Sequence, residues 1–296
     1  MLCSTIIPTV NRPSLERAVK SALEQDLDLD LYEIIVVNDS GTPLPEVDWL
    51  NSPRIKVVNT NRVERCVARN VGASLASGKY LHFLDDDDYL VPGGLKALLS
   101  ASDTSNCCWI HGMLNRVDDD DEFISINRAD IEGNILAFVV AGEVIHLGQS
   151  LIRRDKFFQV GGFDPLLKTV EDRDLECRMA LISDFGRTDH VIVNVRVGIG
   201  GISTTDWSRL RQDSRVAREK ALNSQGSLAR MIDSIGDNVR LRGRCCRAYL
   251  NSAILNLRAG KFFISCSRLL PLLRLASFYP LLPNFWRGLF YRSYQD

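Results

Sequence analysis

The stretch from Lys79 to Pro92 constrains the fold of this chain more than any other. Residues 80–84 form a short, mostly apolar run with aromatic side chains, bounded by Ser77-Gly78 and by Pro92-Gly93-Gly94, and this pattern predicts a buried β-strand. Four aspartates, Asp85 to Asp88, follow that strand. Acidic runs are usually solvated turns. Ligands of open α/β sheets, however, bind beyond the carboxyl ends of the strands, so the position favours a binding site.

Four adjacent carboxylates also predict what that site binds. Like charges this close repel one another, and a folded chain tolerates them when water, a cation or hydrogen-bond donors neutralise them. Ligand sets made only of oxygen suit Mg²⁺ or Mn²⁺, and such a cation would hold the phosphates of a nucleotide. The acidic strand end therefore predicts a metal–nucleotide site.

The sequence around this strand predicts a parallel sheet. Apolar, β-branched runs predict strands at 2–8, 32–38 and 54–59, and helical periodicity predicts helices at 15–25 and 63–77. Ser14 is expected to cap the first helix and Gly78 to end the second. Strand, helix, strand, strand, helix, strand is the order of an α/β sheet of nucleotide-binding type.

The pattern is looser after Pro92. Asp118 to Asp121 join two strands of a predicted hairpin, so we expect this second acidic run to be a solvated turn. The remaining predictions are a helix at 94–101, hairpin strands at 107–116 and 122–127, a strand at 147–153, a helix at 171–183 that stops near Gly186, and a strand at 190–197.

Charge divides the chain into two parts. Residues 1–205 carry 20 Lys and Arg against 31 Asp and Glu, a net charge of −11, whereas residues 206–296 carry 16 against 6, a net charge of +10. We therefore expect an α/β domain at 1–205 and a basic helical extension at 206–296. An acidic body suggests metal chemistry, and a basic extension suggests contact with anionic surfaces.

The basic extension mixes Leu, Phe, Tyr and Trp with cations at 240–257, 262–278 and 280–294, which suits the interfacial region of a membrane. A helical pair packed on the body, or a partner interface, is the alternative. No apolar run reaches the ~18 residues of a membrane span, and no secretory signal pattern is found. The eight cysteines include no CxxC pair, which favours reduced thiols and a cytoplasmic location.

Glu171 and Asp172 open the helix predicted at 171–183. Backbone N–H groups at a helix start favour negative charge, so these carboxylates stay ionised. An ionised aspartate at the mouth of a cleft can accept a proton from a hydroxyl nucleophile, which is the task of a general base. An ordinary helix N-cap is the alternative, and only the combination with the acidic strand end favours catalysis.

Six segments of the chain together resemble family 2 glycosyltransferases. In order and spacing they are Ile6 to Pro13, Glu33 to Ser40, Ala68 to Ala73, Phe83 to Asp88, Gly161 to Asp164, and Glu171-Asp172. Each segment alone is weak, but six in register are specific, and the resemblance covers residues 2–205. It implies a GT-A fold with flanking helices, a nucleotide-sugar donor, a divalent cation (Mg²⁺ or Mn²⁺), and inversion at the anomeric carbon by direct displacement.

The resemblance also implies roles for single residues. Pro8, Thr9, Asn11 and Arg12 would line the nucleotide pocket. Asp39 would accept from the ring N–H of uracil or thymine, which makes a UDP-sugar the expected donor. Arg69 and Asn70 would approach the diphosphate or the ribose.

In the acidic run, the resemblance implies that Asp85 faces the ribose and Asp87 ligates the metal, while Asp86 and Asp88 assist. It also identifies Asp172 as the catalytic base. Together these residues would let the cation offset the charge of the departing diphosphate, while the base makes the acceptor oxygen nucleophilic on the opposite side of the sugar.

The chain departs from the family at Asn38, where an aspartate is common but Asp39 preserves the acidic function, and after the last strand. Many relatives carry a histidine after the last strand, whereas Val195 to Ser203 contain none. We therefore expect fewer protein ligands to the metal. His111 and His146 flank β segments, where packing or hydrogen bonding is the default role for a lone histidine. His146 could also border the acceptor site.

Our hypothesis from the sequence is an inverting, metal-dependent transferase that moves a sugar to a hydroxyl of a glycan or lipid-linked acceptor. It would act in the cytoplasm, with contact at the inner face of the membrane left open. A nucleotidyltransferase and a non-catalytic glycan-binding protein of the same fold remain alternatives. A dinucleotide oxidoreductase is disfavoured because no G-x-G-x-x-G follows the first strand, and no nucleic-acid-binding motif is found.

Overall fold

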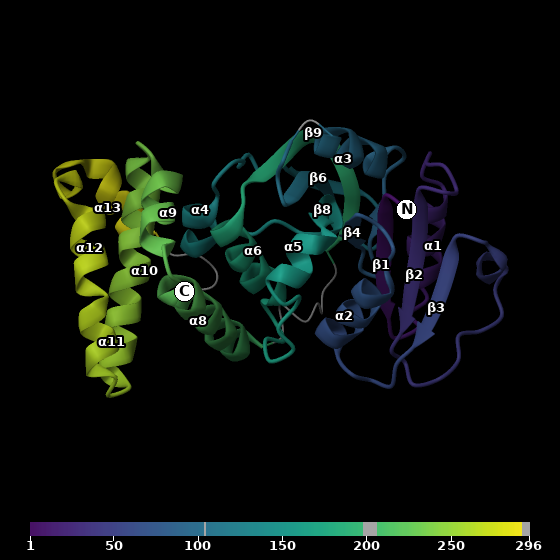
Figure 1. The fold of residues 1–296 in the computed structure, drawn as a ribbon, viewed down its shortest axis with the longest axis horizontal. Helices are drawn as coiled ribbons and strands as arrows, with labels where there is room; N and C mark the ends of the chain where they lie inside the picture. The colour runs from purple at the N-terminus through teal and green to yellow at the C-terminus, as the bar shows by residue number, and fades with distance from the viewer. Residues whose placement is uncertain (104, 198–205, 292–296) are drawn as a thin grey trace.

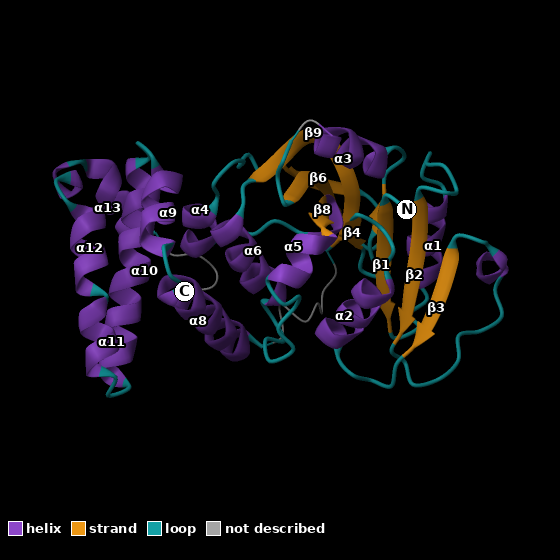
Figure 2. Ribbon diagram, in the orientation of Figure 1, coloured by secondary structure: helices purple, strands orange, loops and turns teal. Residues whose placement is uncertain are grey.

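One mixed β-sheet organises the computed structural model, which describes residues 1–103, 105–197 and 206–291 (Figures 1 and 2). Within these residues, nine strands pair in the order β3-β2-β1-β4-β8-β6-β9-β5, with β7 beside β6. The strands are β1 (Cys3–Thr9), β2 (Tyr32–Asn38), β3 (Ile55–Asn59), β4 (Tyr80–Phe83), β5 (Tyr89–Leu90), β6 (Trp109–Val117), β7 (Phe123–Asn127), β8 (Ser150–Arg153) and β9 (Phe185–Arg196).

The first half of the sheet is parallel, as predicted. β1 pairs with β2 and with β4, and β2 pairs with β3, all in parallel register. Every residue of β2 and β4 is buried, because helices cover both faces of these two strands and leave neither face open to solvent. The carboxyl ends of β1, β2 and β4 therefore meet at one edge.

The second half of the sheet mixes strand directions. β8 is antiparallel to both β4 and β6, whereas β9 runs parallel to β6 and antiparallel to β5. The predicted hairpin is confirmed, since β6 and β7 are antiparallel neighbours joined by a turn. In that turn Asp119 and Asp120 are exposed, but Asp121 forms ion pairs with Arg17 and Arg196.

Helices cover both faces of the sheet. One face packs against α1 and α3, and the other packs against α2, α4 and α6. The helices of this part are α1 (Leu15–Leu23), α2 (Arg65–Leu75), α3 (Gly94–Asp103), α4 (Leu136–Ala141), α5 (Arg154–Gln159) and α6 (Glu171–Ile182), with 3₁₀ turns η1 (Asp48–Asn51) and η2 (Leu147–Gln149).

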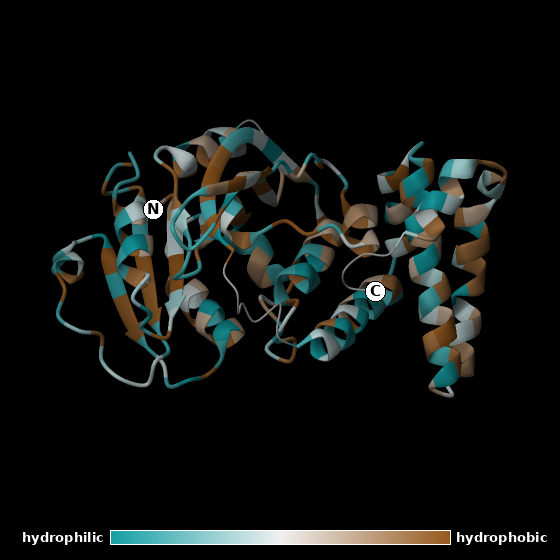
Figure 3. Ribbon diagram, turned by 180° about the vertical axis from the view of Figure 1, so that it is seen from behind, coloured by the Kyte–Doolittle hydropathy of each residue, from teal (hydrophilic) through white to brown (hydrophobic). Residues whose placement is uncertain are grey.

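The basic extension is helical, as predicted, and lies at the end of the molecule farthest from β3 (Figure 1). It consists of α8 (Trp207–Asn223), α9 (Ser227–Ile235), α10 (Val239–Arg258), α11 (Phe262–Ser267), α12 (Leu269–Ala276), η3 (Tyr279–Leu281) and α13 (Pro283–Leu289). Its inner residues continue the hydrophobic cluster beneath α2 and α6, through α4, as far as Phe285. Hydrophobic bands also mark its outermost helices (Figure 3). None of the described helices is both long and apolar enough to cross a membrane.

Several predicted boundaries were wrong, for local reasons. Gly78 is not the C-cap of α2, which is Ala76; a Cβ at Gly78 would lie 2.7 Å from the Ser4 backbone nitrogen, so close strand approach requires this glycine. Ser14 does precede α1 as the N-cap, but its side chain makes no capping hydrogen bond. The predicted strand at 147–153 begins only at Ser150, because Leu147–Gln149 form η2.

The last predicted strand also starts earlier than expected. β9 begins at Phe185 instead of His190, and α6 ends at Ile182. Gly186 therefore lies inside the strand and does not stop the helix. A Cβ at Gly186 would lie 2.8 Å from the Ile110 side chain of β6, so the glycine permits close packing there.

The crossing of α10 and α13 gives a testable prediction. A Cβ at Gly288 would overlap the Arg240 carbonyl oxygen, and one at Gly243 would overlap the Phe285 carbonyl oxygen. Because backbone atoms cannot rotate away, we expect Gly288→Ala to lower the free energy of unfolding by about 1–3 kcal/mol, measured by urea denaturation. Asn284→Ala, at an exposed position of the same helix, should change it by less than about 0.5 kcal/mol. Equal effects of the two substitutions would contradict this close crossing.

Candidate functional site

The predicted site residues gather at the edge where the parallel strands end. Thr9 ends β1, Asp39 follows β2, and Asp85 follows β4 by two residues. The register aligns β1 with β2 up to Thr9 and Asn38, so these ends lie side by side. This arrangement confirms that the acidic run occupies a strand end of an open sheet and is not an isolated surface turn.

A buried arginine connects the acidic run to the start of α6. Arg69 on α2 is 2% exposed, and its guanidinium donates to Asp85 and, at 2.7 Å, to Glu171. Arg65 adds a second ion pair to Glu171 at 2.9 Å. Arg69 therefore holds the acidic strand end and the first turn of α6 together.

The charge of Arg69 also decides the ionisation of Asp85. Burial acts to raise the pKa of Asp85, but the charge of Arg69 outweighs burial and holds that pKa well below its ordinary value. Asp85 is therefore a permanent anion at neutral pH. Its Oδ1 accepts from Arg69.

Thr9 and Arg12 hold the middle of the acidic run. The Thr9 hydroxyl donates to Asp86 at 2.6 Å, and the Arg12 guanidinium lies 2.9 Å from Asp86 and 3.0 Å from Asp87. Asn11, in a left-handed conformation with φ 66°, donates its backbone N–H to Thr9 Oγ1. The loop after β1 and the acidic run therefore form one hydrogen-bonded unit, in which the Asp87 side chain is half exposed.

Asp88 and His146 form a second group with Asp85. One ligand atom from each residue lies within 4.8 Å of the others, a spacing that a single metal ion could bridge. Asp88 is buried and accepts the Arg196 backbone N–H at 3.1 Å, while its Oδ2 lies 3.7 Å from His146 Nε2. Burial, reinforced by the charges of Asp85 and Asp87, raises the pKa of Asp88 well above its ordinary value.

The ring of His146 is neutral at physiological pH. Burial lowers the pKa of His146 below its ordinary value, and the charge of Asp85 only partly opposes this. The Gly148 backbone N–H donates to Nδ1 at 3.2 Å, so the proton of the neutral ring sits on Nε2, facing Asp88. In this tautomer Nε2 is a hydrogen-bond donor, and it becomes a metal ligand only if the Gly148 bond is given up.

Asp39 and Asn70 already have protein partners. Asp39 accepts from Thr60 Oγ1 and from the backbone N–H groups of Val63 and Glu64. Asn70 pairs its amide with both backbone groups of Phe163, at 2.8 and 3.0 Å. Asp39 therefore fixes the loop before α2, and Asn70 fixes the turn before α6. Pro8 pairs with Val37 inside the sheet.

Asp172 lies in the first turn of α6, as predicted, and its side chain is partly buried. Its Oδ1 accepts the Arg173 backbone N–H at 2.7 Å, so the carboxylate is oriented by its own helix. The neighbouring Glu171 is tied to Arg69, which in turn contacts Asp85. This chain of contacts brings the proposed base to the same edge as the acidic run.

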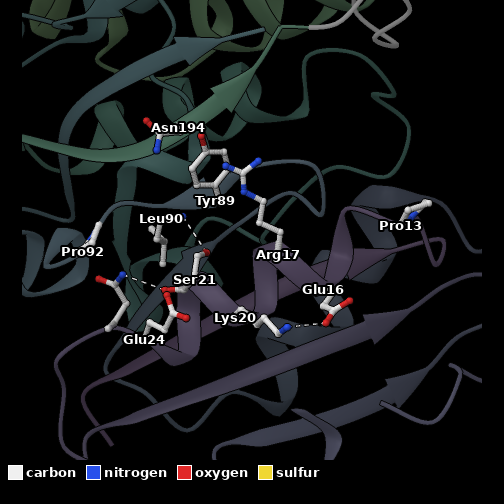
Figure 4. A pocket seen from close by; sticks show the side chains of 11 residues that line it. Pro13, Glu16, Arg17, Lys20, Ser21, Glu24, Tyr89, Leu90, Pro92 and Asn194 are labelled. Carbon is white, nitrogen blue, oxygen red and sulfur yellow. Dashed lines mark hydrogen bonds and ion pairs between the residues drawn. The ribbon is translucent and has the colours of Figure 1, made fainter. Parts of the chain in front are cut away.

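A separate groove lies between α1 and β5 (Figure 4). It has a volume of about 590 Å³, and Arg17 covers the Tyr89 ring there at 3.4 Å from its centroid. Its lining combines Lys20 with Glu16 and Glu24, and none of the predicted site residues lines it. The groove is therefore distinct from the acidic site, and its mixed charges indicate no particular ligand.

Sequence reasoning missed Glu171, Asp88 and Arg196 as organising residues of the site. It named Asp88 only as an assisting residue, and it left His146 as a structural histidine or a neighbour of the acceptor. No signal in the sequence places His146 beside Asp88. The position of Glu171 next to Asp172, in contrast, could be read directly from the sequence. His111 has the expected structural role, since it is buried and hydrogen-bonded to the Ile131 carbonyl at 2.8 Å. Residues 198–203, which belong to the region where the resemblance places a late histidine, lie outside the described residues.

Comparison with known proteins identifies the family of the chain. The profile of the family described as "Glycosyl transferase family 2" matches residues 4–158. An uncharacterized glycosyltransferase of Rickettsia bellii is 29% identical over 144 residues, which are 46% of this chain and 20% of that protein. The poly(ribitol-phosphate) beta-N-acetylglucosaminyltransferase TarP of Staphylococcus aureus is 31% identical over 115 residues, 37% of this chain and 35% of that protein. The chain thus matches about a third or less of the length of these two relatives.

The fold has a solved counterpart. The crystal structure of S. aureus TarS residues 1–349 in complex with UDP-GlcNAc superposes with a TM-score of 0.61 and 15% identity, covering 99% of this chain and 93% of that one. The predicted GT-A-type α/β fold with a C-terminal helical extension is therefore confirmed.

Proposed function

The chain belongs to glycosyl transferase family 2, and on this premise we propose that it transfers a sugar from a nucleotide-diphosphate donor to a hydroxyl acceptor with inversion. The observation that carries the proposal is the bridge from Asp85 through Arg69 to Glu171. It joins an acidic strand end, suited to a donor's metal and phosphates, to a helix start that carries a candidate base. A UDP-sugar is the expected donor, and the TarS complex with UDP-GlcNAc is consistent with that choice.

On the donor side, we propose that the loop after β1 and the acidic run bind the nucleotide together. Thr9 and Arg12 are already hydrogen-bonded to Asp86, so Pro8, Asn11 and Arg12 would form a preorganised wall of the pocket. Asp39 Oδ2 accepts a single hydrogen bond, which leaves it able to accept from the ring N–H of a uracil base. Asn70 would act indirectly, by fixing the turn before α6.

For the metal, the donor set fits a hard divalent cation. Asp85 and Asp88 each use one carboxylate oxygen in a protein hydrogen bond and keep the other for a ligand. Bound Mg²⁺ or Mn²⁺ would neutralise charge on the departing diphosphate. We propose that Asp85 and Asp88 hold the cation together with Asp87, whose carboxylate would have to turn away from Arg12. His146 would donate its Nε2–H toward the diphosphate.

For the acceptor, we propose that Asp172 removes the hydroxyl proton. Its Oδ1 is held by the Arg173 N–H, which leaves Oδ2 for the acceptor. The acceptor would be a glycan or a lipid-linked sugar. TarP bears a name that specifies a poly(ribitol-phosphate) acceptor, and we extend to this chain only the class of hydroxyl-bearing glycan. Such an enzyme would work in the cytoplasm, at the inner face of the cell membrane.

Release of UDP from a panel of UDP-sugars, with and without EDTA, tests the proposed function. We expect turnover that EDTA abolishes and Mn²⁺ restores. Unchanged turnover after chelation would exclude a metal role. Release of pyrophosphate from a nucleoside triphosphate would identify a nucleotidyltransferase, and donor binding without turnover would identify a glycan-binding protein.

The metal site gives a prediction that does not depend on turnover. We expect Asp88→Asn to weaken Mn²⁺ binding at least about tenfold, because one of the carboxylates that face the cation is lost. Calorimetric titration of Mn²⁺ without donor measures this effect. His146→Gln should weaken Mn²⁺ binding much less if the ring acts as a donor to the diphosphate. Asp119→Asn, in the exposed turn between β6 and β7, is the matched control, and a loss of affinity equal to that of Asp88→Asn would contradict the assignment.

A further inference from the structure

The outermost helices of the extension expose large apolar side chains. We define the C-terminal face by six residues of α11, α12, η3, α13 and their flanks, all 59% to 88% exposed: Phe263, Leu270, Leu273, Phe278, Leu281 and Phe290. Figure 3 shows the hydrophobic colouring of this end of the molecule. Single exposed hydrophobic residues are common, but a group on neighbouring helices marks an interaction site.

The α11–α12 segment buries two polar side chains while it exposes several large apolar ones. Its buried side contains Ser265, which donates to the Ala253 carbonyl, and Arg268, which is 4% exposed and binds Glu219 at 2.9 Å. Its outer side carries Phe263, Leu270 and Leu273. Leu275 is buried in the core, but these two polar contacts hold Ser265 and Arg268 inward, and the more exposed leucines of α12 lie on the outer side.

The charged side chains in the part of the chain that carries this face are all positive. Residues 238–291 contain nine Lys or Arg and no Asp or Glu. Among the described residues, Lys261, Arg274 and Arg287 are exposed and form no ion pair with a carboxylate. The C-terminal face thus combines exposed aromatic and aliphatic side chains with uncompensated cations, which is the composition of interfacial membrane-binding helices.

We propose that the C-terminal face binds the surface of an anionic lipid bilayer. Phe263, Leu273 and Phe278 would enter the boundary between headgroups and acyl chains, and Lys261, Arg274 and Arg287 would contact lipid phosphates. The inference rests on the proposed function, because it identifies the surface through which the enzyme would meet a lipid-linked or membrane-bound acceptor.

Charge favours a bilayer over the other occupants of such a face. Two copies of this chain would bring two strongly cationic regions together, and like charges oppose that contact. Nucleic acid would satisfy the cations, but it offers no apolar phase for the exposed Phe and Leu side chains. An anionic bilayer satisfies both groups at once.

Vesicle co-sedimentation of the full chain tests the proposal. We expect the protein to bind vesicles of phosphatidylcholine and phosphatidylglycerol (about 70:30) and to bind pure phosphatidylcholine far more weakly. The triple variant Lys261→Gln, Arg274→Gln, Arg287→Gln should bind the anionic vesicles about 100-fold more weakly. The double variant Phe263→Ser, Leu273→Ser should lose about as much, because two apolar side chains no longer leave water.

Matched controls separate this effect from general damage. Phe123→Ser, at an exposed position of β7, and Lys79→Gln, at an exposed position before β4, should bind vesicles like the parent protein. All variants should unfold at the parent temperature and keep UDP release with a soluble acceptor. Absence of binding to anionic vesicles, or unchanged binding of both multiple variants, would overturn the proposal. Two other results would also overturn the proposal. One is a dimer of the parent protein that the double variant Phe263→Ser, Leu273→Ser no longer forms, and the other is binding of duplex DNA that this double variant retains. Vesicle binding without donor turnover would count against the proposed function alone.

Discussion

Replacement of Asp172 by asparagine should lower the turnover number about 10²- to 10⁴-fold, the range that a positioned general base contributes. Asparagine preserves the size of the side chain and the hydrogen bond from the Arg173 N–H, but it cannot take a proton from the acceptor. The donor's dissociation constant should change little, because Asp172 faces the acceptor in the proposed arrangement. Steady-state UDP release gives the turnover number, and calorimetry gives donor binding.

Two comparisons make the Asp172→Asn result specific. Asp119→Asn removes an equivalent charge from an exposed turn and should leave turnover unchanged. Asp172→Glu keeps the basic group but moves it by one methylene, so it should retain part of the activity. Parent-level turnover in Asp172→Asn would exclude this residue as the base and would direct attention to Glu176, which is buried one turn further along α6.

Replacement of Arg69 by methionine should lower the free energy of unfolding by about 3–5 kcal/mol, the cost of leaving buried charge uncompensated. Arg69 is buried and contacts both Asp85 and Glu171, and Glu171 is itself 3% exposed. Methionine fills a similar volume, so the loss reports charge and hydrogen bonds more than packing. Urea denaturation of the full chain measures it.

A double-variant cycle tests whether the bridge is the cause. Adding Glu171→Gln to Arg69→Met should recover part of the lost stability, because one of the two stranded carboxylates is then neutral. Arg69→Lys should fall between the parent and Arg69→Met, since a lysine keeps the charge but cannot donate to both carboxylates with the same geometry. Additive effects of Arg69→Met and Glu171→Gln would contradict a direct bridge.

The parallel half of the sheet was predictable from the sequence because its strands are buried on both faces. Such strands appear as continuous apolar runs, and β2 has the bounds expected for it. The acidic run was also informative because of its position, directly after the buried β4. What the run binds, and in which geometry, required the residues that surround it.

The second half of the sheet was harder to predict because its elements depend on partners. α4 is six apolar residues long, and a run of that length predicts a strand as readily as a helix. β5 has only two residues and exists because β9 lies beside it. Neither element has a local signal strong enough to define it.

In the candidate site, the residues that stand in strong local sequence patterns were predicted. The residues that reach the site only through contacts between distant segments were missed. Asp85, Asp87 and Asp172 stand in recognisable segments. The link through Arg69 joins three segments that are far apart in the chain, and His146 lies beside Asp88 only after β8 has paired with β4. Ion pairs between different helices and strands leave no periodic pattern in the sequence, so they could not be predicted from it.

The hydrophobic cluster that passes from α2 and α6 through α4 into α10 has an evolutionary consequence. The match to the family profile ends at residue 158, yet the hydrophobic core extends to Phe285. A lineage could therefore not exchange one set of C-terminal helices for another without changing α4 as well. The profile match therefore covers a shorter part of the chain than the hydrophobic core that α4 shares with the C-terminal helices.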